Sequence, residues 1–564
     1  MNQSQEQLTP MRRFWRLLQP DGKEIKNVYT YAIFNGLVNL SLPLGIQAIV
    51  NLIQGGQVNT SWFILVGLVV FGVAVTGILQ IYQLRIVENL QQKIFTRAAF
   101  DFTHRVPRIK MEELYKQYAP ELMNRFFDVM SIQKGLSKIL IDFSAASLQV
   151  IFGLLLLSFY HPFFILFSLL LVVLIVVIFR LTAQVGLRTS LVESKKKYQT
   201  AHWLEELART NITFKLSGTP ELAMKKTDEN VSQYLTARES HFQILIKQYS
   251  LMVGFKVIVA LGLLAIGGLL VMEQLMNIGQ FVAAEIIILL IMNSVEKLIL
   301  ALETIYDVLT GLEKVGQVTD LELEPIDGIN IEDSSFEKGL DLKVDKLTYT
   351  YPEEPKPTIK DVSFEIKKGQ SILITGPNGS GKSTLLYLMA GIYDIKEGQI
   401  LYDDYSKATI STESLRRVVG ECLSHEMLFQ GTLKENICMG KDVNLDRLKE
   451  VSAVVGLTKF VNSLEKGFET FIDPQGKGLP RSIVQKVIIA RALASYPKLL
   501  VFEEFLEAID KEERKQIIDY ITDPTNGWSL IAASNDEYFR SKVDQVLTLN
   551  EGQVESITTN PKKA

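Results

Sequence analysis

The chain has 564 residues, too many for one hydrophobic core, so at least two domains are expected. Its formal net charge is -4, which provides no basic footprint for nucleic acid, and no nucleic-acid partner is expected. Two cysteines, Cys422 and Cys438, exclude a disulfide framework and fit a reducing compartment. Residues 1–19 are polar and basic and predict no cleaved signal peptide.

Six apolar segments lie in the first 300 residues, and each is long enough to cross a bilayer, which needs roughly 20 apolar residues. Buried helices of a large soluble protein are the alternative, but the run 163–179 is apolar on every face, which favours lipid contact. The predicted spans are 27–54, 61–82, 139–159, 161–180, 251–272 and 275–300.

The charges between the spans predict the topology. Basic residues precede the first span and are frequent in the connections 83–138 and 181–250, whereas the connections 54–61, 160–162 and 273–277 contain no Lys or Arg. Because positive residues stay on the cytoplasmic side, we expect a multi-pass protein of the cytoplasmic (inner) membrane with both termini in the cytoplasm.

The two inner connections are long and helical in pattern, so each predicts a helical hairpin that projects from the membrane. The tip of the first is expected at 110–120, where Met111, Leu114, Tyr115 and Tyr118 are available for docking on a soluble partner. The tip of the second is expected at 204–209. Solvated hairpins without a coupling role are the alternative.

Several polar residues lie inside the predicted spans, where ionisable groups indicate function by default. Lys256 and Asp142 are near span ends and are expected to snorkel, whereas Glu285 is deeper and faces a bundle interior or cavity. Substrate contact and interhelical hydrogen bonding both remain open for Glu285. The full set is Asn35, Asn39, Asp142, Lys256, Glu285 and Asn293.

The pattern divides the chain into a transmembrane domain at 1–310, a charged and turn-rich linker at 311–337, and a soluble domain at 338–564. In the soluble domain an apolar run at 371–375 predicts a strand, and 385–390 predicts a helix. Between them stands the phosphate-binding P-loop pattern Gly376, Pro377, Asn378, Gly379, Ser380, Gly381, Lys382, Ser383 and Thr384.

The P-loop residues predict nucleotide binding for physical reasons. Glycines let backbone N–H groups curl around phosphates, and the helix N-terminus adds positive potential. Lys382 is expected to reach the β- and γ-phosphates of ATP, and the Ser383 hydroxyl to bind Mg²⁺. A glycine-rich turn without a ligand is the alternative, but Lys-Ser at this spacing has little purely structural use.

Six spans, long inner helices and a following P-loop domain resemble the exporter-type ATP-binding cassette (ABC) half-transporters, nearest to the type I secretion and peptide exporters. The resemblance implies an all-α six-helix transmembrane domain followed by an α/β P-loop nucleotide-binding domain. It also implies that Tyr351 stacks on adenine, that 499–502 is the Walker B strand, and that Glu504 is the general base. The cofactors it implies are ATP and Mg²⁺.

The chain departs from the family pattern at several motifs. Ser424 stands where the family has a glutamine, Glu503 where it has the metal-binding Walker B aspartate, and Asn535 where it has the switch histidine. The signature LSGGQ aligns with Leu479, Pro480, Arg481, Ser482 and Ile483, in which proline lacks an N–H and side chains replace the glycines. We therefore expect a degenerate nucleotide-binding domain in which hydrolysis is slow or absent.

Three functions fit these residues. The first is an export subunit that couples ATP binding to outward movement of a substrate and works as a homodimer or heterodimer. The second is a non-transporting nucleotide-binding regulator or scaffold of a secretion system, with an adaptor protein as partner. The third is the degenerate half of a heterodimeric exporter. The cargo cannot be predicted from this sequence.

Overall fold

The computed structural model describes residues 9–54, 60–115, 117–331, 339–503, 506 and 508–560. By their contacts they form two compact units: the first comprises the residues up to 107 together with 117–321, and the second comprises 108–116 together with 322 onward. A short segment from the first half of the chain, residues 108–115, therefore belongs to the unit formed by the second half.

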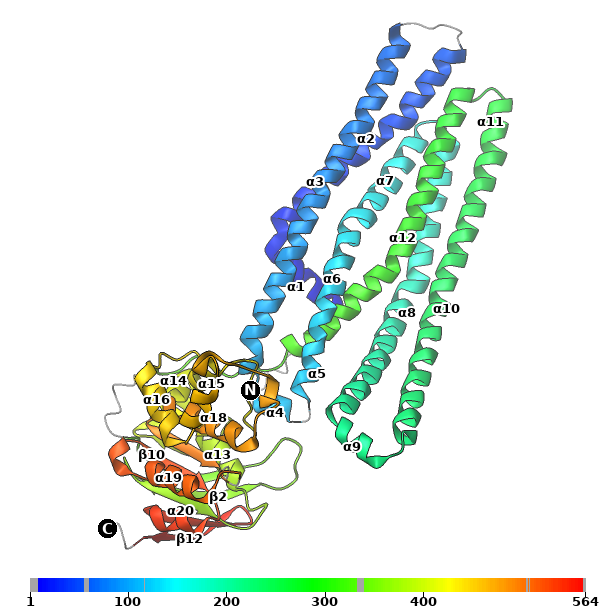
Figure 1. Ribbon diagram of the computed structural model, residues 1–564. Helices are drawn as coiled ribbons and strands as arrows, with labels where there is room; N and C mark the ends of the chain where they lie inside the picture. Colours follow the sequence, from blue (N-terminus) through cyan, green and yellow to red (C-terminus); the bar gives the residue numbers. More distant parts are fainter. Residues whose placement is uncertain are drawn as a thin grey trace. The chain divides into compact units, whose positions relative to one another are not determined.

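The first unit consists of long helices, coloured blue to green in Figure 1. Among the described residues, six helical stretches are long and apolar enough to cross a membrane, which confirms the six predicted spans. Large apolar side chains such as Phe71 and Leu166 are 69% and 67% exposed, as expected for lipid contact. The main helices are α2 Gly22–Gln54, α3 Thr60–Arg105, α7 Ser144–Ser158, α8 Pro162–Arg209, α10 Glu221–Gly262 and α12 Ile278–Thr319.

Local sequence explains where two of these helices begin. Helix α8 starts with Pro162, whose fixed φ suits a first helical turn, and the Nδ1 atom of His161 accepts a hydrogen bond from the N–H of Phe163 at 3.2 Å. Helix α12 starts with a capping box in which Asn277 and Gln280 each accept from the other's backbone N–H. Both caps satisfy N–H groups that have no intrahelical partner.

Two of the six stretches contain a π-helical turn. Ile139–Phe143 joins α6 (Phe127–Lys138) to α7, and Leu263–Gly267 joins α10 to α11 (Gly268–Met272). A π turn carries an extra residue within the helix, and such turns often occur at functional sites.

The tip of the first hairpin is where the sequence predicts it, since α3 ends at Arg105 and α5 (Ala119–Met123) begins the return. The predicted tip of the second hairpin at 204–209 is wrong, because α8 continues through these residues. The turn follows at Thr210 and at 218–220, on either side of α9 (Asn211–Ser217). Gly218 has a φ of +70°, which glycine adopts without strain. This Gly-Thr-Pro signal decides the turn, whereas Glu206 and Arg209 only form an ion pair on the last turn of α8.

The predicted linker at 311–337 also differs from the structure, because α12 continues to Thr319. Arg105 holds this end of α12, donating from Nη1 to the carbonyl oxygen of Thr319 at 2.9 Å. Arg13, on α1 (Pro10–Leu18), pairs with Glu313 at 3.5 Å and Asp320 at 2.5 Å. Residues 332–337 of the predicted linker lie outside the described residues.

The second unit contains two larger sheets. A six-stranded sheet has the order β12-β11-β3-β10-β9-β6, in which β12 is antiparallel to β11 and the other neighbours are parallel. An antiparallel sheet has the order β2-β1-β4-β5. The strands are β1 Leu342–Tyr349, β2 Ile359–Ile366, β3 Ser371–Thr375, β4 Glu397–Tyr402, β5 Tyr405–Ser406, β6 Val419–Cys422, β9 Leu499–Glu503, β10 Ser529–Ala533, β11 Gln545–Asn550 and β12 Gln553–Thr559.

Strands β3, β9 and β10 are almost fully buried, as expected for parallel strands covered on both faces. Helix α13 (Lys382–Met389) follows β3, which confirms the predicted strand–turn–helix order around the P-loop. The long helix α18 (Arg481–Ala494) packs into the same core through Val487, Ile488 and Leu493. Together these elements confirm the predicted α/β class of the second half.

Candidate functional site

Four of the predicted site segments follow parallel strands of the six-stranded sheet. The P-loop follows β3, Asn535 lies just after β10, Glu503 ends β9, and Ser424 lies just after β6. These strands are consecutive in the sheet, and the carboxyl ends of parallel strands meet at one edge. The topology therefore brings together residues that are up to 160 positions apart, from Thr375 to Asn535.

The backbone of the P-loop needs glycine at two positions. Gly376 has a φ of +148°, and a Cβ there would lie 2.1 Å from the carbonyl oxygen of Leu549 on β11. Gly381 has a φ of +100°, and its Cβ would lie 2.8 Å from Ile359 Cδ1. Gly379 has a φ of +81° but faces open space. Gly376 fits the loop against β11 of the six-stranded sheet, Gly381 fits it against β2 of the antiparallel sheet, and Gly379 leaves its outer side clear.

Lys382 begins helix α13, and its ammonium group is held over the loop. Nζ donates to the carbonyl oxygens of Gly376 at 2.8 Å and Pro377 at 3.1 Å. Residues 377–379 and Ser383 are exposed, and the buried Ser380 hydroxyl has no hydrogen-bond partner among the described residues. A cation, a helix N-terminus and an exposed glycine-rich loop together fit the phosphates of a nucleotide.

Tyr351 lies in an aromatic cluster beside the P-loop. Its hydroxyl is 2.9 Å from the hydroxyl of Thr384 on α13. Its ring is stacked on that of Tyr115, with centroids 5.1 Å apart and planes inclined by 20°. Tyr349 and Tyr393 contact the same ring at nearly right angles. The ring expected to meet adenine is therefore fixed in position and already has three aromatic neighbours, of which only Tyr115 is stacked on it.

The structure joins two of the residues that depart from the family pattern. Glu503 is 6% exposed, and its Oε2 atom accepts a hydrogen bond from the backbone N–H of Ser424 at 2.9 Å. The carboxylate expected at the metal is thus bonded to the backbone at the position where the family is expected to have a glutamine. Glu504, the expected general base, lies outside the described residues. Asn535 is exposed after β10, two positions beyond Ala533.

The residues expected to form a degenerate signature lie at the start of α18. Pro480 precedes the helix, Arg481 is its first residue and is exposed, and Ser482 follows within the first turn. Leu479 donates its N–H to the carbonyl oxygen of Gly476 at 2.9 Å. In the described part of the chain, no hydrogen bond or ion pair joins residues 479–482 to the P-loop.

Two carboxyl groups, one in β6 and one shortly after it, were not singled out from the sequence. Burial raises the pKa of Glu421 to about 7, and a second contribution comes from Glu426. Burial also raises the pKa of Glu426, although it accepts from the N–H of Leu423 at 2.9 Å and pairs with Arg491 at 3.3 Å. Nothing in the local sequence indicates this, because the effect depends on packing between distant elements.

Within the membrane unit, Lys256, which is expected to snorkel, forms an ion pair with Glu296 of α12 at 2.6 Å. The sequence analysis missed Glu296, because only the fold brings α10 and α12 side by side. Glu285, on the same helix, is half-buried. Ser294 donates to Gln149 at 3.0 Å, so at least one polar pair is an interhelical hydrogen bond.

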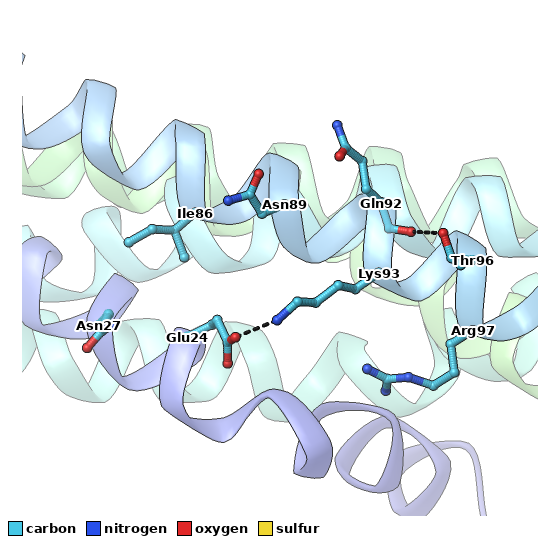
Figure 2. A pocket seen from close by; sticks show the side chains of 8 residues that line it. All are labelled: Glu24, Asn27, Ile86, Asn89, Gln92, Lys93, Thr96 and Arg97. Atoms are coloured by element: carbon cyan, nitrogen blue, oxygen red, sulfur yellow. Dashed lines mark hydrogen bonds and ion pairs between the residues drawn. The ribbon is translucent and has the colours of Figure 1, made fainter.

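A pocket of about 610 Å³ lies between the first residues of α2 and the second half of α3. Figure 2 shows Lys93 extended toward Glu24, and the two groups are 2.5 Å apart. The rest of the lining is mainly amide and hydroxyl side chains, namely Asn27, Asn89, Gln92 and Thr96, together with Ile86 and Arg97.

Two families match this chain. The family described as ABC transporter transmembrane region matches residues 28–295, and the family described as ABC transporter matches residues 359–507. The chain is similar to a solved structure titled "Structure of a bacterial Atm1-family ABC exporter with ATP bound", with a TM-score of 0.80 over 96% of this chain and 95% of that one. The identity is 17%, so this likeness establishes the fold.

Curated relatives are similar over part of their length. The leukotoxin translocation ATP-binding protein LktB of Mannheimia glucosida is 27% identical over 51% of this chain and 40% of that protein. The ATP-dependent lipid A-core flippase of Aliivibrio fischeri is 29% identical over 42% of this chain and 41% of that protein. The chain spans less than half the length of these relatives in each match.

Proposed function

The chain belongs to the ABC transporters, and from this premise we propose that it is an exporter subunit that couples ATP binding to outward movement of a substrate. The observation that carries the proposal is the P-loop between β3 and α13, with Lys382 held over its carbonyls, in a chain that also has six membrane-spanning helices. Transport driven by ATP is the simplest function that uses both a cytoplasmic nucleotide site and a bundle of membrane-spanning helices in one chain.

The residues present fit ATP and partly fit Mg²⁺. Lys382, the loop N–H groups and the start of α13 would hold the phosphates, and Tyr351 would meet the base. Ser383 would hold Mg²⁺, which supplies charge neutralisation at the β- and γ-phosphates. Glu503 would reach the metal only by giving up its bond to the N–H of Ser424.

We propose further that the chain alone turns over ATP slowly. Ser424 and Asn535 replace two groups that position water and phosphate in the family, and Arg481 places a side chain where the family has glycine. Because positioning and charge stabilisation carry phosphoryl transfer, each replacement lowers the rate. The homodimer and the heterodimer with a second half-transporter both remain compatible with this site. The signature substitutions favour, as a second candidate, the degenerate half of a heterodimer.

The test uses the purified full chain in detergent. ATP binding is measured with and without Mg²⁺, and turnover is measured over hours. Lys382→Ala removes a charged contact worth about 1.5–3 kcal/mol, so ATP affinity should fall roughly ten- to hundredfold. Lys434→Ala, at an exposed lysine that pairs with Glu469, is the matched control and should bind normally.

Each outcome decides between the candidates. ATP binding that depends on Lys382, with turnover lost in Glu504→Gln, supports the exporter that acts alone. Binding without turnover, together with co-purification of a second cassette protein, supports the degenerate half. Binding without turnover or a second cassette favours the regulator or scaffold. Failure of the wild-type chain to bind ATP would overturn the proposal.

A further inference from the structure

Tyr115 is held in a fixed position beside the candidate nucleotide site. It follows α4 (Met111–Leu114), the tip of the first hairpin, and its segment belongs to the second unit. The backbone of this segment pairs with the chain that follows α12, since Ile109 forms an antiparallel bridge with Leu323. Lys110 N–H donates to the carbonyl oxygen of Glu322 at 3.0 Å.

Side chains of the tip add further contacts within this unit. Lys110 Nζ lies 2.6 Å from Glu322 and 3.2 Å from Asp394. Glu112 Oε1 accepts a hydrogen bond from the backbone N–H of Asp394 at 2.8 Å. Asp394 directly follows Tyr393, a member of the aromatic cluster around Tyr351. The tip is therefore tied to the same short stretch that supports the cluster.

Within the described part of the chain, the ring of Tyr351 is the only aromatic ring that contacts the ring of Tyr115. The two rings are nearly parallel, the arrangement in which stacked aromatic side chains stabilise each other. The Tyr351 hydroxyl in turn contacts the hydroxyl of Thr384, which lies two positions after Lys382. A continuous line of contacts thus runs from Tyr115 through Tyr351 to the P-loop helix.

From this line of contacts, and resting on the proposed function, we infer that Tyr115 is a positioning residue for the adenine base. By covering one face of Tyr351, Tyr115 holds that ring in the orientation that offers its remaining surface to the base. The phosphates are bound by the P-loop without help from Tyr115. The effect of Tyr115 should accordingly appear only with ligands that carry a base.

The test compares ATP with inorganic tripolyphosphate, which has the phosphates but no base, on the full chain in detergent. Loss of one stacked aromatic partner changes affinity by about two- to tenfold. Tyr115→Ala should therefore weaken ATP by about that factor and leave tripolyphosphate unchanged. Tyr115→Phe keeps the ring and should restore ATP affinity. Met111→Ala, on the same short helix, is the matched control.

A double-mutant cycle separates this role from a structural one. If Tyr115 acts through Tyr351, then Tyr115→Ala should cause no further loss in a Tyr351→Ala background. Equal weakening of ATP and tripolyphosphate, additive losses in the cycle, or tighter ATP binding by Tyr115→Ala would each overturn the inference. If the wild type binds ATP but one of these three results is found, the role of Tyr115 is refuted and the proposed function is not. If the wild type does not bind ATP, both the role of Tyr115 and the proposed function are refuted.

Discussion

Replacement of Gly376 by alanine tests whether the loop is shaped by contact with its own sheet. The φ of +148° is one that side-chain-bearing residues rarely adopt, and the new Cβ would lie 2.1 Å from a carbonyl oxygen of β11. That oxygen belongs to Leu549, on the strand next to β3. The loop can accept the methyl group only if it moves away from the sheet.

The expected cost has two parts. Holding alanine in a sparsely populated backbone conformation costs about 1–3 kcal/mol. Overpacking against a fixed backbone atom costs a further 1–3 kcal/mol or so. The sum is roughly 4 kcal/mol, which lowers the midpoint of thermal unfolding by about 10 °C for a domain of this size. Gly379→Ala, with a φ of +81° and open space, should cost only about 1 kcal/mol.

The two cysteines allow the second unit to be observed alone. Cys422 and Cys438 are the chain's only cysteines, and both are buried in that unit. A thiol-reactive fluorescent dye added to the full chain during heating therefore reports its unfolding. Gly376→Ala should also lose ATP binding, and Gly379→Ala should keep more of it. Equal midpoints for the two variants would refute the reasoning, because only one of them has the clash.

Three further outcomes are expected. Gly316→Ala should displace the Arg13 guanidinium, because a Cβ would lie 2.2 Å from its Nη1 atom, and should weaken the pairs of Arg13 with Glu313 and Asp320. Because the end of a flexible side chain can move aside, the loss of thermal stability in detergent should stay at about 1 kcal/mol, and a loss several times larger would contradict this. The pKa of Glu421 is about 7 in the folded chain and near 4.5 in the unfolded chain. The free energy of unfolding should therefore fall by up to about 3 kcal/mol as the pH rises from 4.5 to 7, and then level off. Denaturant titrations of E421Q should lack this pH dependence. Lys256 and Glu296 are 2.6 Å apart, so Lys256→Gln should leave the Glu296 carboxylate without its partner and lower thermal stability in detergent. Adding Glu296→Gln should restore part of that loss, and strictly additive losses would argue against the pair.

The parts of the fold that depend on local pattern could be predicted from the sequence. Apolar runs gave the six spans, and a buried strand followed by glycines and Lys382 gave the strand–turn–helix order of the P-loop. The tip of the second hairpin was misplaced, because residues 204–209 are good helix formers that continue α8, whereas Gly218 and Pro220 carry the turn signal.

Contacts between distant positions could not be predicted. The pairing of Lys256 with Glu296 depends on which faces of two helices meet, and a single sequence does not fix helix rotation. The same holds for Tyr115 and Tyr351, which are far apart in the chain and meet only because the hairpin tip belongs to the second unit. The bond from Ser424 to Glu503 likewise requires β6 and β9 to be neighbours.

The π-helical turns at Ile139–Phe143 and Leu263–Gly267 decide which flanks of two spans face the interior of the bundle. Because a π turn holds one extra residue, the helix that follows it is rotated by about 100° around its axis relative to an uninterrupted α-helix. Removing one residue from either turn would therefore present a different set of side chains to the neighbouring helices.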